Sequence, residues 1–146
     1  MKFKLKGMAA LVARLEKLAQ EEVKVGIFKH SKYGPENNHL SVAQVALWQE
    51  QGTATSPSRP FMSTTMSNAE VEDIIKFGMK AAVAAVAHKS DPDKFLDGIG
   101  EGVAGFMQLT AFDWPGSNSE STIKSKGFND PLLHTGKMID SITYQR

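Results

Sequence analysis

Histidine is the residue type best suited to acid–base or metal chemistry here, and its copies are scattered, at His30, His39, His88 and His134. No two of them have the spacing of metal ligands on one helix, and the chain contains no cysteine, so the sequence predicts no metal site. His134 lies near Asp140, a pairing that would suit acid–base catalysis. No nucleophile motif, paired carboxylates or phosphate loop accompanies them, so a small hydrolase using these two residues is only our third hypothesis.

The run "GIGEGVAG", residues 98 to 105, superficially matches a nucleotide-binding loop. A phosphate cradle needs its glycines at a strand-to-helix turn, where backbone amides are free to bind the phosphate. Here the run falls inside a helix that is predicted to follow Pro92. The sequence therefore predicts no cofactor.

Lysines near both ends of the chain could form a basic patch for a nucleic-acid backbone. The candidates are Lys2, Lys4, Lys6, Lys124, Lys126 and Lys137. They lack clustered aromatic residues and a basic helix, and the formal net charge is only +1. Separately solvated lysines are the simpler interpretation. A nucleic-acid-binding accessory protein is our alternative hypothesis, and a salt-steep affinity for duplex DNA would support it.

The stretch "EQGTATSPSRPFMSTTM" contains a stiff, positively charged corner at residues 56 to 61. Pro57 and Pro60 fix their own φ and bias the residues before them toward extended conformations. Arg59 offers a planar fork for carboxylates or carbonyl groups of a partner, and Phe61 offers an apolar plug. The corner is either an arm that docks on a neighbouring subunit or a clamp that joins two helices of its own chain, and both roles can hold together.

The N-terminal part of the chain predicts a helix followed by a strand. The helix has its apolar residues at helical spacing on one face: Met8, Leu11, Val12, Leu15, Leu18 and Ala19. Residues 23 to 28, "VKVGIF", alternate and are rich in β-branched side chains, which predicts a strand. The next segment, "KHSKYGPENNH", is rich in turn formers and predicts an exposed loop.

A second helix is predicted over residues 42 to 51. Ser41 and Gln44 have the spacing of a capping box at its start, and Gly52 is well placed to end it. Trp48 lies off the apolar face of this helix, so we expect it to point toward other elements or another subunit.

Two longer helices follow and predict a hairpin. The first opens at the capping-box spacing of Ser67 and Glu70 and runs for about 20 residues. The second begins behind Asp91 and Pro92 and runs to about Phe112.

Glycines inside the second hairpin helix require an explanation. Gly98, Gly102 and Gly105 fall on one narrow strip of its surface. Each interior glycine costs about 1 kcal/mol relative to alanine, so something must offset them. We expect a flat strip that lets another backbone approach closely, from the same chain or a neighbour. A loosely formed, flexible helix is the alternative.

The C-terminal part combines a long polar segment with a strand. Residues 113 to 130, which include Trp114, predict an extended loop that is either an interaction arm or mobile. "SITYQR" at the end predicts a strand. The sequence therefore predicts an α+β fold, in which residues 23 to 28 and the C-terminal strand form a small antiparallel sheet packed against several helices, including the long hairpin.

Length and composition indicate one soluble domain over residues 1 to 146. Hydrophobic residues make up 41% of the chain and charged residues 23%, close to the average of globular proteins. The longest low-charge stretch, "AAVAAVA", falls far short of the roughly 20 apolar residues that a membrane span needs. We therefore expect no membrane partner.

Several motifs, in this order, resemble those of tailed-phage neck and tail-completion proteins. They are the strand "VKVGIF", a Tyr-Gly loop, "SVAQVALWQEQGT", "SRPFM", the helical hairpin, "DWPGSNSESTIKSKG" and "PLLHTGKMIDSI". The shared pattern is Glu-x-Gly-Thr, then Arg-Pro-Phe, then Pro-Leu-x-x-Thr-Gly near the end. The resemblance covers residues 23 to 143 approximately.

The resemblance implies a structural virion protein rather than an enzyme. Such proteins assemble as a homo-oligomeric ring, commonly a hexamer, between the head connector and the tail tube or tail terminator. The expected location is the neck of the virion, after assembly in the host cytoplasm, and genome DNA would pass through the lumen without specific binding. A ring needs heterologous contacts between copies. The residues expected at the subunit interface are Trp48, Pro57, Arg59, Pro60, Phe61, Gly98, Gly102, Gly105 and Trp114.

Overall fold

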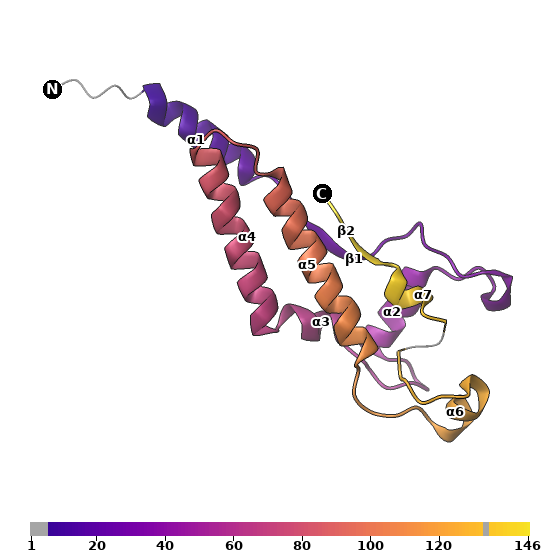
Figure 1. Cartoon of the computed structure of the whole chain (residues 1–146). Helices are drawn as coiled ribbons and strands as arrows, with labels where there is room; N and C mark the ends of the chain where they lie inside the picture. The colour runs from indigo at the N-terminus through magenta and orange to yellow at the C-terminus, as the bar shows by residue number, and fades with distance from the viewer. Residues whose placement is uncertain (1–5, 133–134) are drawn as a thin grey trace.

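The structure is a computed structural model that describes residues 6 to 132 and 135 to 146. A two-stranded antiparallel sheet packs against helices, the longest of which form a hairpin, so the predicted α+β fold is confirmed (Figure 1). The elements in chain order are α1 (Lys6–Leu18), β1 (Lys24–Ile27), the 3-10 helix η1 (Pro35–Asn37), α2 (Val42–Gln51), α3 (Phe61–Met66), α4 (Ala69–Ala87), α5 (Asp93–Phe112), α6 (Glu120–Lys126), α7 (Lys137–Asp140) and β2 (Ile142–Gln145).

The hairpin of α4 and α5 is the centre of the molecule (Figure 1). Asn68, rather than Ser67, caps α4, because its side-chain oxygen accepts a hydrogen bond from the Glu70 amide at 2.8 Å. Asp91 supports the start of α5 in the same way, accepting from the Asp93 amide at 3.0 Å. The predicted hairpin is correct, and its first capping residue is shifted by one position.

The sheet packs mainly on α5. Lys24 of β1 faces Gln145 of β2, and Ile27 faces Ile142, in an antiparallel register. The Gln108 side chain of α5 donates to the Ile142 carbonyl oxygen at 3.0 Å. Beyond the strand, the Arg146 guanidinium lies 2.6 Å from the Asp93 carboxylate. β2 is therefore fastened to α5 along its length.

Helix α5 joins two clusters of buried side chains. The cluster at its N-terminal half contains Leu18, Val71, Ala82, Val86, Leu96, Ile99 and Val103. The cluster at its C-terminal half contains Val42, Ala46, Phe61, Ala104, Met107, Ala111, Leu132, Met138, Ile139 and Ile142. Helices α1 and α4 supply the first cluster, whereas α2, α3, α7 and β2 supply the second (Figure 1).

The predicted apolar face of α1 is only partly buried. Leu18 is buried near the end of α4, and the Arg14 Nε donates to the Val86 carbonyl oxygen at 3.2 Å. Met8 and Val12, which were expected on the same apolar face, are exposed. The N-terminal half of α1 therefore extends past the part of α4 that covers it (Figure 1).

The segment 113 to 130 is not one extended loop, because it contains α6. Ser119 caps α6, and Gly127 ends it with a φ of 84°. The Asn118 amide donates to the Asn129 side-chain oxygen at 2.7 Å, which closes the segment on itself. The prediction of an extended loop was wrong here, since a seven-residue helix is too short to leave a periodic pattern.

Candidate subunit interface

The corner between α2 and α3 is organised by Glu50. Its carboxylate accepts hydrogen bonds from the Met62 amide at 3.0 Å and the Ser63 amide at 2.9 Å, and the Ser63 hydroxyl also donates to it. These amides belong to the first turn of α3, where the helix itself offers them no acceptor. The backbone oxygen of Glu50 accepts from the Ser58 hydroxyl at 2.6 Å. Glu50 thus fastens both the turn and the next helix to the end of α2.

Gly52 and Thr53 make the tight turn that follows. Gly52 has a φ of 77°, and a Cβ at this position would lie 2.8 Å from the backbone nitrogen of Ser58. Only glycine fits there without strain. The Thr53 hydroxyl accepts from the amides of Thr55 at 3.3 Å and Ser56 at 3.1 Å. The Glu-x-Gly-Thr motif therefore has a local structural role.

Arg59 and Phe61 turn back onto their own chain. The Arg59 guanidinium donates to the side-chain oxygens of Gln49 at 2.9 Å and Asn118 at 3.4 Å, and so links α2 to the segment before α6. Phe61 is completely buried in the cluster around the C-terminal half of α5. Its side chain has no surface left to offer a neighbouring subunit. Phe61 therefore acts as part of the clamp within its own chain and not as an apolar plug for a neighbour.

The two prolines of the corner have different surroundings. Pro57 is exposed, whereas Pro60 is half-buried at the start of α3. Among the corner residues predicted to meet a neighbour, Pro57 is therefore the most exposed.

Removing the Glu50 carboxylate should destabilise the fold. We expect Glu50→Ala to cost about 1–2 kcal/mol of unfolding free energy, because two N-terminal amides of α3 lose their acceptor. Glu50→Gln keeps one side-chain oxygen and should cost less. Glu16, exposed on α1, supplies the control variant Glu16→Ala, for which we expect no change beyond about 0.5 kcal/mol. Urea unfolding followed by circular dichroism measures these differences, and equal stability of both alanine variants would contradict the capping role.

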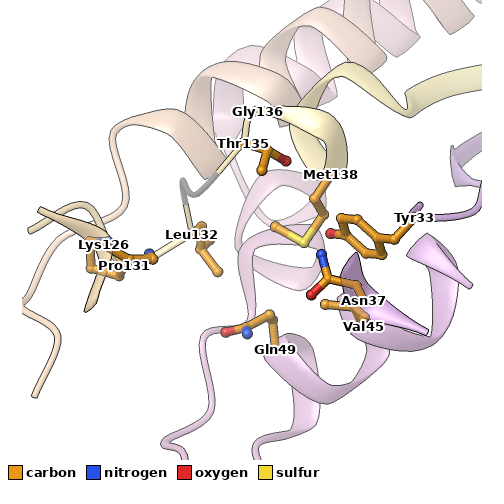
Figure 2. A pocket seen from close by; sticks show the side chains of 10 residues that line it. All are labelled: Tyr33, Asn37, Val45, Gln49, Lys126, Pro131, Leu132, Thr135, Gly136 and Met138. Carbon is orange, nitrogen blue, oxygen red and sulfur yellow. The ribbon is translucent and has the colours of Figure 1, made fainter. Parts of the chain in front are cut away.

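Motif residues far apart in sequence converge on a hollow of about 210 Å³ (Figure 2). Tyr33 and Asn37 come from the segment between β1 and α2, and Val45 and Gln49 from α2. The other lining residues run from the end of α6 to α7: Lys126, Pro131, Leu132, Thr135, Gly136 and Met138. Burial raises the pKa of Tyr33, so its hydroxyl stays protonated at neutral pH. Burial and the nearby Arg59 lower the pKa of Lys126. The separate motifs give no local signal that they meet, because the hollow forms only when distant segments pack together.

The glycines of α5 have two kinds of environment. A Cβ on Gly102 would lie 3.1 Å from Ile74 of α4, so this glycine faces its own chain rather than a neighbour. Apart from the nearby backbone of α5 itself, no atom of residues 6 to 132 or 135 to 146 lies within 4 Å of a Cβ placed on Gly98 or Gly105. Packing within the chain therefore explains Gly102 and leaves Gly98 and Gly105 unexplained.

Leu109 and Phe112 continue the open side of α5. They follow Gly98 and Gly105 at spacings that place all four residues on one face of a helix. Leu109 is 60% exposed and Phe112 is 56% exposed. We call these four residues the open face of α5. Sequence analysis found its glycines but missed its large side chains, although their helical spacing could have revealed them.

A glycine of α5 outside the predicted strip is packed closely against the sheet. A Cβ on Gly100 would lie 2.3 Å from Cδ2 of Tyr144 in β2. We expect Gly100→Ala to lower the unfolding free energy by about 1–3 kcal/mol, because the strand cannot retreat without losing its contacts with α5. Gly98→Ala is the matched control and should raise stability by up to about 1 kcal/mol. Thermal or urea unfolding distinguishes the pair, and a stabilising Gly100→Ala would contradict the close approach of β2.

The two tryptophans differ in exposure. Trp48 is 41% exposed on α2, beside the exposed Leu47, as expected of a residue off the apolar face of that helix. Trp114 is half-buried and packs against the cluster around the C-terminal half of α5. Trp48 therefore has more surface than Trp114 for contact with another molecule.

The residues of the other hypotheses are placed as follows. His134, Lys2 and Lys4 lie outside the described residues. Asp140 is exposed in α7, and the side chains of Lys124 and Lys137 are exposed. Lys126 donates to the Asp130 carbonyl oxygen at 2.9 Å. Within the described ranges, no group of three or more His, Cys, Asp or Glu could hold a metal ion, and no helix is long and apolar enough to cross a membrane.

Comparison with protein-family models, with curated proteins and with solved structures found no match.

Proposed function

We propose that this protein is a structural component of a tailed-phage neck, which completes the tail or joins it to the head connector as a homo-oligomeric ring. The observation that carries the proposal is the open face of α5. Its two glycines cost about 1 kcal/mol each relative to alanine, and among the described residues no neighbouring element packs against their Cβ positions to offset this cost. A neighbouring backbone packed closely against them would offset it.

The large side chains on the same face give a second reason for self-association. More than half of the surface of Leu109 and Phe112 is exposed. They lie on the same face as Gly98 and Gly105, which have no side chain to hinder the approach of another chain. On α4, Phe77 lies one turn from Ile74 and is 78% exposed. Leu109 and Phe112, three residues apart on one helix, form an exposed apolar group, and such groups are typical of surfaces that bind another protein. Burying Leu109 and Phe112 would favour association by about 1.5–3 kcal/mol each.

A ring also needs subunits that keep their shape. The hydrogen bonds of Glu50 and Arg59 hold α2, α3 and the segment before α6 together within one chain. Such a corner is preformed, so it would lose little conformational entropy on docking. Trp48 and Pro57, on the exposed side of this corner, are the residues that we propose for contact with a neighbour. The mechanism is binding, with no chemical step.

The mass of the assembled species tests this proposal. Native mass spectrometry or light scattering is applied to the protein alone and after mixing with tail tubes or connectors. We expect a closed oligomer of defined copy number, either alone or on the tubes. A protein that stays monomeric and ignores both structures overturns the proposal, and salt-steep binding to duplex DNA in the same assay would favour a nucleic-acid-binding protein instead.

A further inference from the structure

Strand β1 is paired along only one of its edges. Its hydrogen-bonded partner is β2, and within the described residues no other backbone hydrogen bond reaches residues 24 to 27. On β2, in contrast, the Ile142 carbonyl accepts from Gln108 of α5. An unpaired edge presents a row of free N–H and C=O groups that can accept another strand.

An apolar groove runs beside this edge. It is a hollow of about 380 Å³ lined mainly by apolar side chains, among them Val23 and Val25 at β1, Ile75 and Met79 of α4, and Ile99 and Val103 of α5. The groove lies at the face of β1 that carries Val23 and Val25, and α4 and α5 line its other side. A strand added at the unpaired edge of β1 would place its side chains on the same face, over the groove. The sheet covers α5 on this side of the hairpin and leaves the neighbouring surface of α4 open.

We propose that residues 1 to 5 of a neighbouring copy add a third strand to the edge of β1. The sequence of this segment, "MKFKL", alternates apolar and basic residues with the period of a β-strand. In an added strand, Phe3 and Leu5 point to one side and enter the groove, while the lysines point to the other. Main-chain hydrogen bonds would give affinity, and the groove would select the apolar side chains.

The same segment of the same chain cannot reach this edge. Helix α1 has 13 residues, which gives it a length of about 20 Å. It begins at the end that is remote from β1 and runs toward the strand (Figure 1). Five fully extended residues span at most about 18 Å. The length of α1 alone exceeds the reach of five residues, so residues 1 to 5 cannot extend back to β1 of their own chain. We therefore infer that the strand comes from another copy.

Charged side chains near the groove limit the register of the incoming strand. Glu21, which lines the groove, lies 3.5 Å from Arg146, and the Glu22 carboxylate lies 3.0 Å from Lys24. Residues 22 and 24 are on the side of the strand opposite to Val23 and Val25. A lysine of the incoming strand makes a favourable cross-strand pair across from Glu22 and is repelled across from Lys24.

Crosslinking tests which chain donates the strand. The strand proposal itself rests on the self-association proposed above. The natural chain has no cysteine, so Phe3→Cys combined with Met79→Cys gives one reactive pair for a short bismaleimide. We expect dimers and longer ladders on denaturing gels. Met79 and Val83 are 40% and 43% exposed on α4, and only Met79 lines the groove. Phe3→Cys with Val83→Cys is therefore the matched control and should give at least fivefold less product. A crosslink within one chain, or equal yields from both pairs, overturns the proposal.

A peptide experiment tests the groove even if no ring forms. The full chain carrying Phe3→Asp and Leu5→Asp cannot fill its neighbours' grooves and is titrated with a fluorescent peptide, MKFKLKG. We expect saturable binding that weakens at least tenfold with Met79→Lys and is unchanged with Val83→Lys. Absent binding, or binding indifferent to Met79→Lys, overturns the strand proposal. If the Phe3→Asp/Leu5→Asp variant assembles as readily as the natural chain, the strand proposal fails while the proposed function stands.

Discussion

Replacing Gly105 with leucine is expected to abolish assembly while leaving the monomer folded. No neighbouring element in the described part of the chain approaches the Gly105 Cβ position, so we expect the isolated subunit to accept a leucine there. In the proposed ring a neighbouring backbone occupies that space, and a leucine would hold the two helices apart. We expect the oligomer to disappear from native mass spectra at concentrations where the natural chain is fully assembled.

Two further variants distinguish the effect of side-chain size at Gly105 from a general disturbance of the protein. Gly105→Ala should stabilise the monomer by up to about 1 kcal/mol through helix propensity, and yet weaken assembly. Ala13→Leu adds similar bulk at an exposed position of α1 and should leave assembly intact. An oligomer that tolerates Gly105→Leu would show that the open face of α5 is not an interface.

The second large effect is expected at Phe61. Phe61→Ala should lower the unfolding free energy by about 3–5 kcal/mol, because a fully buried aromatic ring leaves a cavity in the cluster that joins α2, α3 and α5. Domains of this size are commonly stable by only about 5–15 kcal/mol, so a large part of the total would be lost. Urea unfolding at a concentration that keeps the chain monomeric measures the change.

Phe112 supplies the matched control, since the same substitution is made at an exposed ring. Phe112→Ala should change monomer stability by no more than about 0.5 kcal/mol and should weaken assembly. The two variants thus have opposite signatures: Phe61→Ala impairs folding, and Phe112→Ala impairs association. Equal losses of stability in both would contradict the placement of Phe61 in the core.

Elements with a long periodic pattern could be predicted from the sequence. The helix at residues 42 to 51 has the predicted bounds, and the second hairpin helix ends at Phe112 as expected. The pairing of β1 with the C-terminal strand was also predicted. Each of these elements has an amphipathic pattern or a glycine or proline at its boundary, and such signals are local.

Short elements and long-range hydrogen bonds were missed for a physical reason. Helices α3 and α6 have six and seven residues, too few for a periodic signal. Glu50 caps α3 from the preceding helix, so the capping residue lies outside the local spacing that a capping box requires. Ser41 precedes α2 as predicted but makes no side-chain capping bond.

The candidate interface was predictable in part. The helical wheel placed Gly98, Gly102 and Gly105 on one strip, and the sequence could not tell which of them faces α4. Ile74 fills the space beside Gly102 because of how the two helices are turned against each other, which is a tertiary property. For the same reason the sequence left both a docking arm and an intramolecular clamp open for the Arg-Pro-Phe motif, and the structure shows that Arg59 and Phe61 hold their own chain together.

High-resolution imaging of an assembled phage neck tests the central claim most directly. The account predicts this chain in a closed ring at the head-to-tail joint, with a neighbouring copy's backbone packed against Gly98 and Gly105 and with Leu109 and Phe112 buried by the contact. A chain that is absent from the joint, or that lies there with the open face of α5 exposed to solvent, would contradict it.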